Sequence, residues 1–158
     1  MTARRAVWIA VICVIAAVAL LAAFLIILTF VGSRMQNASR FAKETAALAS
    51  IRTIHTAQVQ YYSQYGRFAT SLAELGPPAS GAPSAAAADL IPADLASGEK
   101  HGYKFTMTGN GIEYQILAIP ISFGVTGSRT FYSDQTMVIR ENDGPAPATV
   151  NSKEVGAP

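Results

Sequence analysis

The sequence predicts an α+β fold, in which a long N-terminal helix packs on a small antiparallel β-sheet. Three observations predict it: an apolar run near the N-terminus, a helical spacing of apolar residues after that run, and a strand-like alternation in the last third of the 158-residue chain. A sheet with one apolar face needs a cover, and the apolar stripe of the helix can supply it.

The composition limits the classes of function. Charged residues make up 14% of the chain, fewer than the roughly 25% of typical soluble domains. The net charge of +2 comes from Lys and Arg residues that form no run, so we expect no nucleic-acid binding. The single cysteine, Cys13, lies in the apolar run. We therefore expect no disulfide within the chain and no CxxC zinc site. We also expect no other metal site and no cofactor.

The apolar run covers residues 6–31, and its one polar side chain is Thr29. A helix needs about 20 apolar residues to cross a bilayer, whereas the apolar core of a signal peptide has about 7 to 15. We therefore expect a retained transmembrane helix over residues 6–32, after a short flank at residues 1–5. Arginines lie on both sides of it, so charge alone does not give the orientation.

Small residues in this helix predict a packing surface. Ala16, Ala19 and Ala23 follow one another at spacings of three and four, which allow two helices to approach closely. The alternative is that alanine is simply common in this apolar helix.

An amphipathic helix is predicted over residues 33–65, because apolar residues recur there mostly at spacings of three and four. The pattern is interrupted by a seven-residue gap between Phe41 and Leu48. Phe41, Leu48 and Ile51 are the predicted helix-packing or assembly residues of this stretch.

An aromatic cluster surrounds the predicted end of this helix, where Gly66 is placed to stop it. The cluster consists of Tyr61, Tyr62, Tyr65 and Phe68. We interpret it as a hydrophobic plug where helix, turn and sheet meet. The alternative, a ligand or base-stacking surface, would need interleaved basic residues that the sequence lacks.

Short elements and a loop follow the cluster. Ser71 and Glu74 predict a capping box for one short helix that ends at Gly76. Residues 76–88 are rich in Pro, Gly, Ser and Ala and predict a flexible loop. A helical turn is expected after Pro92, with its stop at Gly98.

Two hairpins are predicted in the antiparallel sheet of residues 103–140. Residues 103–107 and 112–119 alternate around a turn at Asn110 and Gly111, and residues 129–134 and 136–141 around a turn near Asp134. Periodicity is lost afterwards, so residues 141–158 are expected to form a disordered tail.

This order of parts resembles the type IV pilin and pseudopilin superfamily. The segments SIRTIHTAQVQYYSQYGRFATSLAELG, residues 50–76, and SRTFYSDQTMVIR, residues 128–140, carry the resemblance. It implies a pilin-like domain over residues 33–140 of a bacterial inner-membrane protein that spans the membrane once, with its C-terminal domain periplasmic or extracellular. The implied function is a structural or accessory subunit of a type IV pilus or type II secretion-like assembly. The implied partners are the membrane and other copies or pilin-like subunits.

The N-terminus departs from the pilin pattern. Such proteins carry a short leader that ends in glycine and a glutamate at the fifth mature position, whereas residues 1–14 contain no glycine and no acidic residue. A second hypothesis therefore stays open: a single-pass anchored binding module that does not polymerise. It would recruit a partner through the loop at 76–88 or through an edge of the sheet.

Catalytic side chains are sparse in the sequence. His55 and His101 have no clustered carboxylate or cysteine near them, and Ser133 would need a base from elsewhere in the chain. The simpler role for the adjacent Asp134 is to start a turn. We expect neither enzymatic activity nor a small-molecule substrate.

Overall fold

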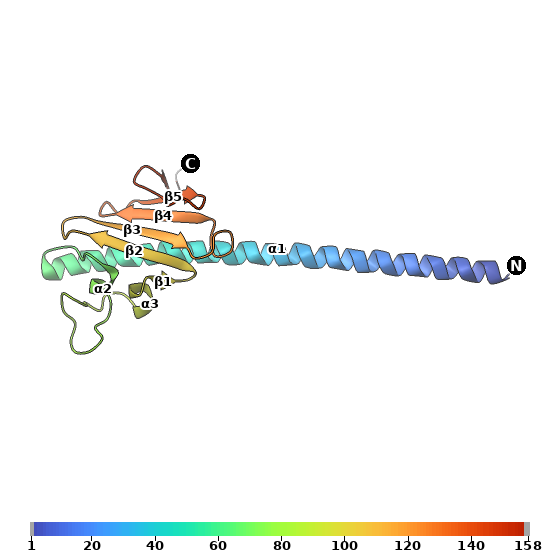
Figure 1. The fold of residues 1–158 in the computed structure, drawn as a ribbon, viewed down its shortest axis with the longest axis horizontal. Coiled ribbons are helices and arrows are strands. Elements are labelled where there is room, and N and C mark those ends of the chain that lie inside the picture. Colours follow the sequence, from blue (N-terminus) through green and yellow to red (C-terminus); the bar gives the residue numbers. More distant parts are fainter. Residues whose placement is uncertain (1, 157–158) are drawn as a thin grey trace. The chain divides into compact units, whose positions relative to one another are not determined.

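The computed structural model describes the backbone of residues 2–156. It describes side chains at residue 8, at residues 19–26 and from residue 34 to residue 156. The chain divides into two compact units, Met1–Ala38 and Ser39–Pro158. Helix α1 (Thr2–Tyr65) begins in the first unit and ends in the second (Figure 1).

The second unit combines the part of α1 from Ser39 onward with a six-stranded antiparallel sheet in the order β1-β2-β3-β4-β5-β6. This arrangement confirms the predicted α+β class and the long helix. The remaining elements are α2 (Leu72–Leu75), α3 (Ala93–Ala96), β1 (Glu99–Lys100), β2 (Tyr103–Gly109), β3 (Tyr114–Pro120), β4 (Arg129–Asp134), β5 (Ile139–Asp143) and β6 (Lys153–Glu154).

Both predicted hairpins are confirmed. Strands β2 and β3 close at the pair Gly109↔Tyr114, and Oδ1 of Asn110 accepts hydrogen bonds from two backbone N–H groups of the turn, each at 2.9 Å. Strands β4 and β5 pair from Ser133↔Ile139, and Oδ1 of Asp134 accepts a bond from the N–H of Thr136 at 2.9 Å. Each turn is thus closed by the side chain of a short polar residue, as turn chemistry predicts.

The core lies between one face of α1 and one face of the sheet. Along β2, Tyr103, Phe105 and Met107 are buried while the residues between them are exposed, so strand alternation puts every second side chain in the core. The helix contributes Ile51 and Ile54, which are fully buried. Ile51 therefore packs where the helical spacing predicted it.

The other two predicted packing positions of the amphipathic helix differ from Ile51. Leu48 is partly buried against the core, whereas Phe41 is 66% exposed and does not belong to it. In the gap between them, the buried side chains are Glu44 and Ala47. The buried face of α1 therefore passes through Glu44 and Ala47 at this point and leaves Phe41 exposed. An assembly role for Phe41 stays a prediction.

The predicted transmembrane helix and inner-membrane location are corrected by the structure. Among the residues that it describes, none of the helices combines the length and the apolar character that crossing a bilayer requires. Cys13 and Ala16, and most other side chains of residues 6–32, lie outside the described set.

The predicted disordered tail is also corrected. Strand β5 continues to Asp143, and β6 pairs with it at Glu141↔Lys153. The hydroxyl of Thr130 donates to the carbonyl of Ala146 at 2.8 Å, and Ala148 is buried. Backbone pairing, side-chain hydrogen bonds and the apolar contacts of Ala148 and Val155 order this segment, and none of them leaves a periodic pattern in a sequence.

The connections between helix and sheet agree with the sequence in part. Gly66 has a φ of +69° and its N–H bonds the carbonyl of Tyr62 at 2.9 Å, so it ends α1 as predicted. The capping box was wrong: Ser71 makes no side-chain cap bond, and Glu74 instead accepts from the hydroxyl of Thr70 at 2.6 Å. The flexibility of the loop at 76–88 stays a prediction.

Candidate functional site

The predicted aromatic cluster is brought together where α1 meets the sheet. The rings of Tyr61 and Tyr65 lie 4.6 Å apart, those of Tyr62 and Phe68 4.9 Å, and Phe68 lies 5.0 Å from Tyr114 of β3. Tyr61 is fully buried, whereas Tyr62 is half exposed. The arrangement agrees with a plug between helix, turn and sheet.

Tyr61 also anchors a polar group under this plug. Its hydroxyl lies 2.8 Å from Oε2 of Glu74 and 2.6 Å from the carbonyl oxygen of Ala85. Nη1 of Arg67 donates to the same Glu74 oxygen at 2.8 Å. Burial, together with the Glu74 carboxylate, raises the pKa of Tyr61 to about 12. The group ties the helix end, α2 and the loop at 76–88 to one another.

His55 joins α1 to two strands through a buried polar chain. Its Nδ1 lies 2.8 Å from the hydroxyl of Tyr114, and its Nε2 lies 2.8 Å from Oγ of Ser133. The Ser133 hydroxyl donates to the carbonyl of Val138 at 2.8 Å, so it must accept from Nε2–H of His55. Burial lowers the pKa of His55, and Asp134 opposes this only in part.

The direction of these hydrogen bonds differs from the one that a catalytic pair of His55 and Ser133 would need. A base for a serine nucleophile would accept the hydroxyl proton, whereas here that proton is directed to Val138. All three side chains of the chain are also buried. The pair is therefore arranged as a link between helix and sheet. His101 lies apart from it, exposed, in the turn between β1 and β2.

A buried ion network at the other end of the sheet was not predicted. Arg129 donates to Oε2 of Glu44 from Nε at 2.9 Å and from Nη2 at 2.8 Å, and to Glu141 from Nη1 at 2.6 Å. Ser128 gives Oε1 of Glu44 two further bonds, from its N–H at 2.7 Å and its hydroxyl at 2.9 Å. The signal in the sequence was the gap between Phe41 and Leu48, which a lone glutamate occupies.

Part of α1 presents apolar side chains to the solvent. All eight residues from 19 to 26 are exposed, including Ala19 and Ala23, and Leu20 reaches 72%. Eight residues make more than two turns at about 3.6 residues per turn, so the whole circumference of the helix is apolar. We call this segment the apolar helix segment.

The sheet carries two adjoining cavities, of about 380 and 400 Å³. Both are lined by Thr108, Gln115 and Tyr132. The first is the more polar, with Glu113 and Asp134 in its lining, whereas the second is closed on one side by residues 147–150. Among the described residues, no group of three His, Cys, Asp or Glu side chains is placed to hold a metal ion.

Comparison of the chain with protein-family models, with curated proteins and with solved structures found no match.

Proposed function

We propose that this protein is a pilin-like structural subunit, which assembles with other copies or with other pilin-like subunits and catalyses no reaction. The type IV pilus and the type II secretion filament are the kinds of assembly that we propose for it. The order of a long N-terminal helix, a loop and an antiparallel sheet supports the proposal.

The observation that carries the proposal is the apolar helix segment. A helix that is apolar on all sides is stable only where apolar neighbours surround it. Leu21, Phe24 and Leu25 are each more than half exposed within a single chain. The same segment of further copies is a partner of matching chemistry, because it offers the same apolar side chains around its circumference.

The experiment is to let the purified full chain assemble and to measure its mass by sedimentation, alongside electron microscopy. We expect polymers from the natural sequence and their loss in the double variant Leu21→Gln with Leu25→Gln. Val59→Gln, which changes an exposed apolar side chain of the second compact unit (residues 39–158, called the sheet unit below), is the matched control and should assemble normally. A natural chain that stays monomeric would refute the proposal and favour the binding module.

A further inference from the structure

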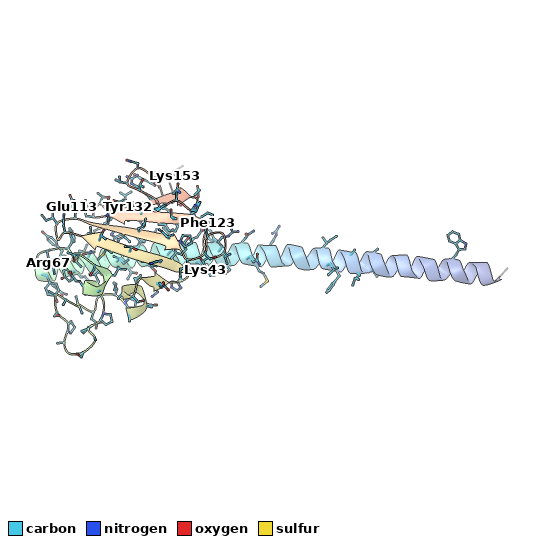
Figure 2. The ribbon with its side chains drawn as sticks, in the orientation of Figure 1. Lys43, Arg67, Glu113, Phe123, Tyr132 and Lys153 are labelled. Carbon is cyan, nitrogen blue, oxygen red and sulfur yellow. The ribbon has the colours of Figure 1, made fainter. Side chains whose placement is uncertain are left out.

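The sheet unit has two unlike ends. At one end lie the turns of both hairpins, next to the pairs Gly109↔Tyr114 and Ser133↔Ile139; we call this the turn end. At the other end lies the loop of residues 121–128, which joins β3 to β4; we call this the loop end. Figure 2 shows Glu113 at the turn end, and Lys43 and Phe123 together at the loop end.

The loop end presents an apolar surface beside a lysine. Ile121, Phe123 and Val125 are all exposed, Val125 to 65%. Hydrogen bonds within the loop hold its shape, including Gly124 N–H to the carbonyl of Gly127 at 2.7 Å. The Lys43 side chain lies close to Gly102, and within the described part of the chain no carboxylate forms a salt bridge with it.

The other lysines of the loop end have acidic neighbours. Lys100 forms a salt bridge with Asp94 at 3.0 Å, and Lys104 stands opposite Glu99 in the register of β1 and β2. Lys43 is therefore the cation of this end that is best placed to meet a second molecule.

The turn end presents acidic groups around a cavity. Glu113 and Asp134 line the cavity of about 380 Å³, and its lining contains neither lysine nor arginine. Glu113 is exposed and forms no salt bridge among the described residues, and the neighbouring Ile112 is 78% exposed. The two turns beside the cavity are closed by the side chains of Asn110 and Asp134, so its walls exist before anything binds.

We propose that the loop end of one copy docks on the turn end of the next, with Lys43 directed to the carboxylates of Glu113 and Asp134. This inference rests on the proposed function. Charges of opposite sign orient the two surfaces, and exposed apolar side chains on both sides supply buried area. Because the two surfaces differ and lie at opposite ends, the contact is heterologous and repeats from copy to copy.

The first test is carbodiimide cross-linking of assembled full-length protein, prepared as an equal mixture of ¹⁴N and ¹⁵N chains. The reagent adds to a carboxyl group to give an O-acylisourea. The neutral amine of an adjacent lysine, after loss of a proton from its ammonium form, attacks the acyl carbon, so that an amide forms and the reagent leaves as its urea. We expect Lys43 joined to Glu113 or Asp134, with light and heavy peptides mixed in the product. Assembled protein that yields no such link would overturn the inference.

The second test is a charge exchange in the full chain. Glu113→Lys and Lys43→Glu should each raise the concentration needed for assembly by about fivefold, since each places like charges together. The double variant should return to within about twofold of the natural chain, because the pair is restored with its signs exchanged. Arg52→Glu, on the exposed face of α1, is the control and should leave assembly unchanged.

The two proposals fail in different ways. A natural chain that does not assemble refutes the subunit role, and with it this contact. A natural chain that assembles with the same concentration dependence as both single variants refutes the contact alone. Lys43→Gln, which only removes the charge, should show a smaller effect than Lys43→Glu in the same direction, provided that circular dichroism shows both variants folded.

Discussion

Glu44 of α1 and Arg129 of β4 form a two-point ion pair, with Nε and Nη2 of the arginine 2.9 and 2.8 Å from one carboxylate oxygen. Glu44 is buried, and its second oxygen accepts both bonds from Ser128. Both partners are thus satisfied while paired. Removal of Arg129 would leave Glu44 buried without its counter-charge, whereas removal of Glu44 would leave Arg129 with one carboxylate partner, Glu141, in place of two.

Glu44→Ala should destabilise the sheet unit strongly. Loss of one partner of a buried pair typically costs about 3–5 kcal/mol. We expect the lower end of this range, because Glu141 still pairs with Arg129 while both Ser128 donors and two of the Arg129 donors lose their acceptor. The measurement is urea unfolding of the full chain, followed by tyrosine near-ultraviolet circular dichroism. Glu99→Ala, at an exposed glutamate, should change the free energy of unfolding by no more than about 0.5 kcal/mol. Equal effects in the two variants would contradict a structural role for the pair.

Acid should weaken the fold in two steps. Burial lowers the pKa of His55 below its ordinary value of 6.5, so the stability that neutral His55 contributes is complete above 6.5 and is lost as the pH falls through its folded pKa. Burial alone would raise the pKa of Glu44, but hydrogen bonds from Ser128 and Arg129 outweigh it and hold the pKa below 4.5. That second contribution is present above 4.5 and is lost at lower pH.

His55→Gln separates these two steps, because glutamine cannot titrate. Unfolding free energies measured across the acid range should lose the upper step in this variant and keep the lower one. If the natural chain showed no fall in stability until the carboxylates titrate, the buried role of His55 would be wrong.

Tyr61→Phe should cost about 1–2 kcal/mol of stability, because it removes the hydroxyl that contacts Glu74 and Ala85 in a buried site. The adjacent Tyr62→Phe provides a matched comparison at a half-exposed tyrosine and should be close to neutral. Urea unfolding of both variants is the measurement. Equal losses in the free energy of unfolding would contradict a structural role for the Tyr61 hydroxyl.

Gly127→Ala should destabilise the loop end by about 1–3 kcal/mol, as overpacking does. A Cβ at this position would overlap the hydroxyl of Tyr103, which otherwise donates to the carbonyl of Arg129 at 2.9 Å. Gly81→Ala meets no atom within 4 Å and carries only the strain of its positive φ, so thermal unfolding should show a smaller loss there. A milder effect at Gly127 than at Gly81 would contradict this account.

The parts of the fold that the sequence predicts are those with a local cause. The alternation in β2, the turn at Asn110 and the stop at Gly66 each follow from a few neighbouring residues, and all three are present in the structure. The predicted capping box was wrong because Thr70 and Ser71 both carry a hydroxyl that could bond Glu74, and the sequence does not distinguish them. The contacts of Tyr61 and Arg67 with Glu74 place its carboxylate beside Thr70.

The polar contacts of the core could not be predicted because they join distant positions. Glu44 and Arg129 are 85 residues apart, and His55 and Ser133 are 78 residues apart. No local pattern in a sequence predicts a hydrogen-bond partner at such a distance. The interrupted stripe after Phe41 shows only that a polar side chain replaces an apolar one, and the pairing itself depends on how the sheet lies on the helix.

Glu44 and His55 attach α1 to the sheet at two points, eleven residues apart, which is about 16 Å along a helix. One point of attachment would leave the sheet free to pivot, and apolar contacts alone would tolerate a shift by one helical turn. Two directional attachments remove both freedoms at once. A force applied along the helix would therefore reach strand β4 near both ends of the strand, through the Glu44–Arg129 and His55–Ser133 bonds. The helix and the sheet should resist shear as a single body until those bonds break.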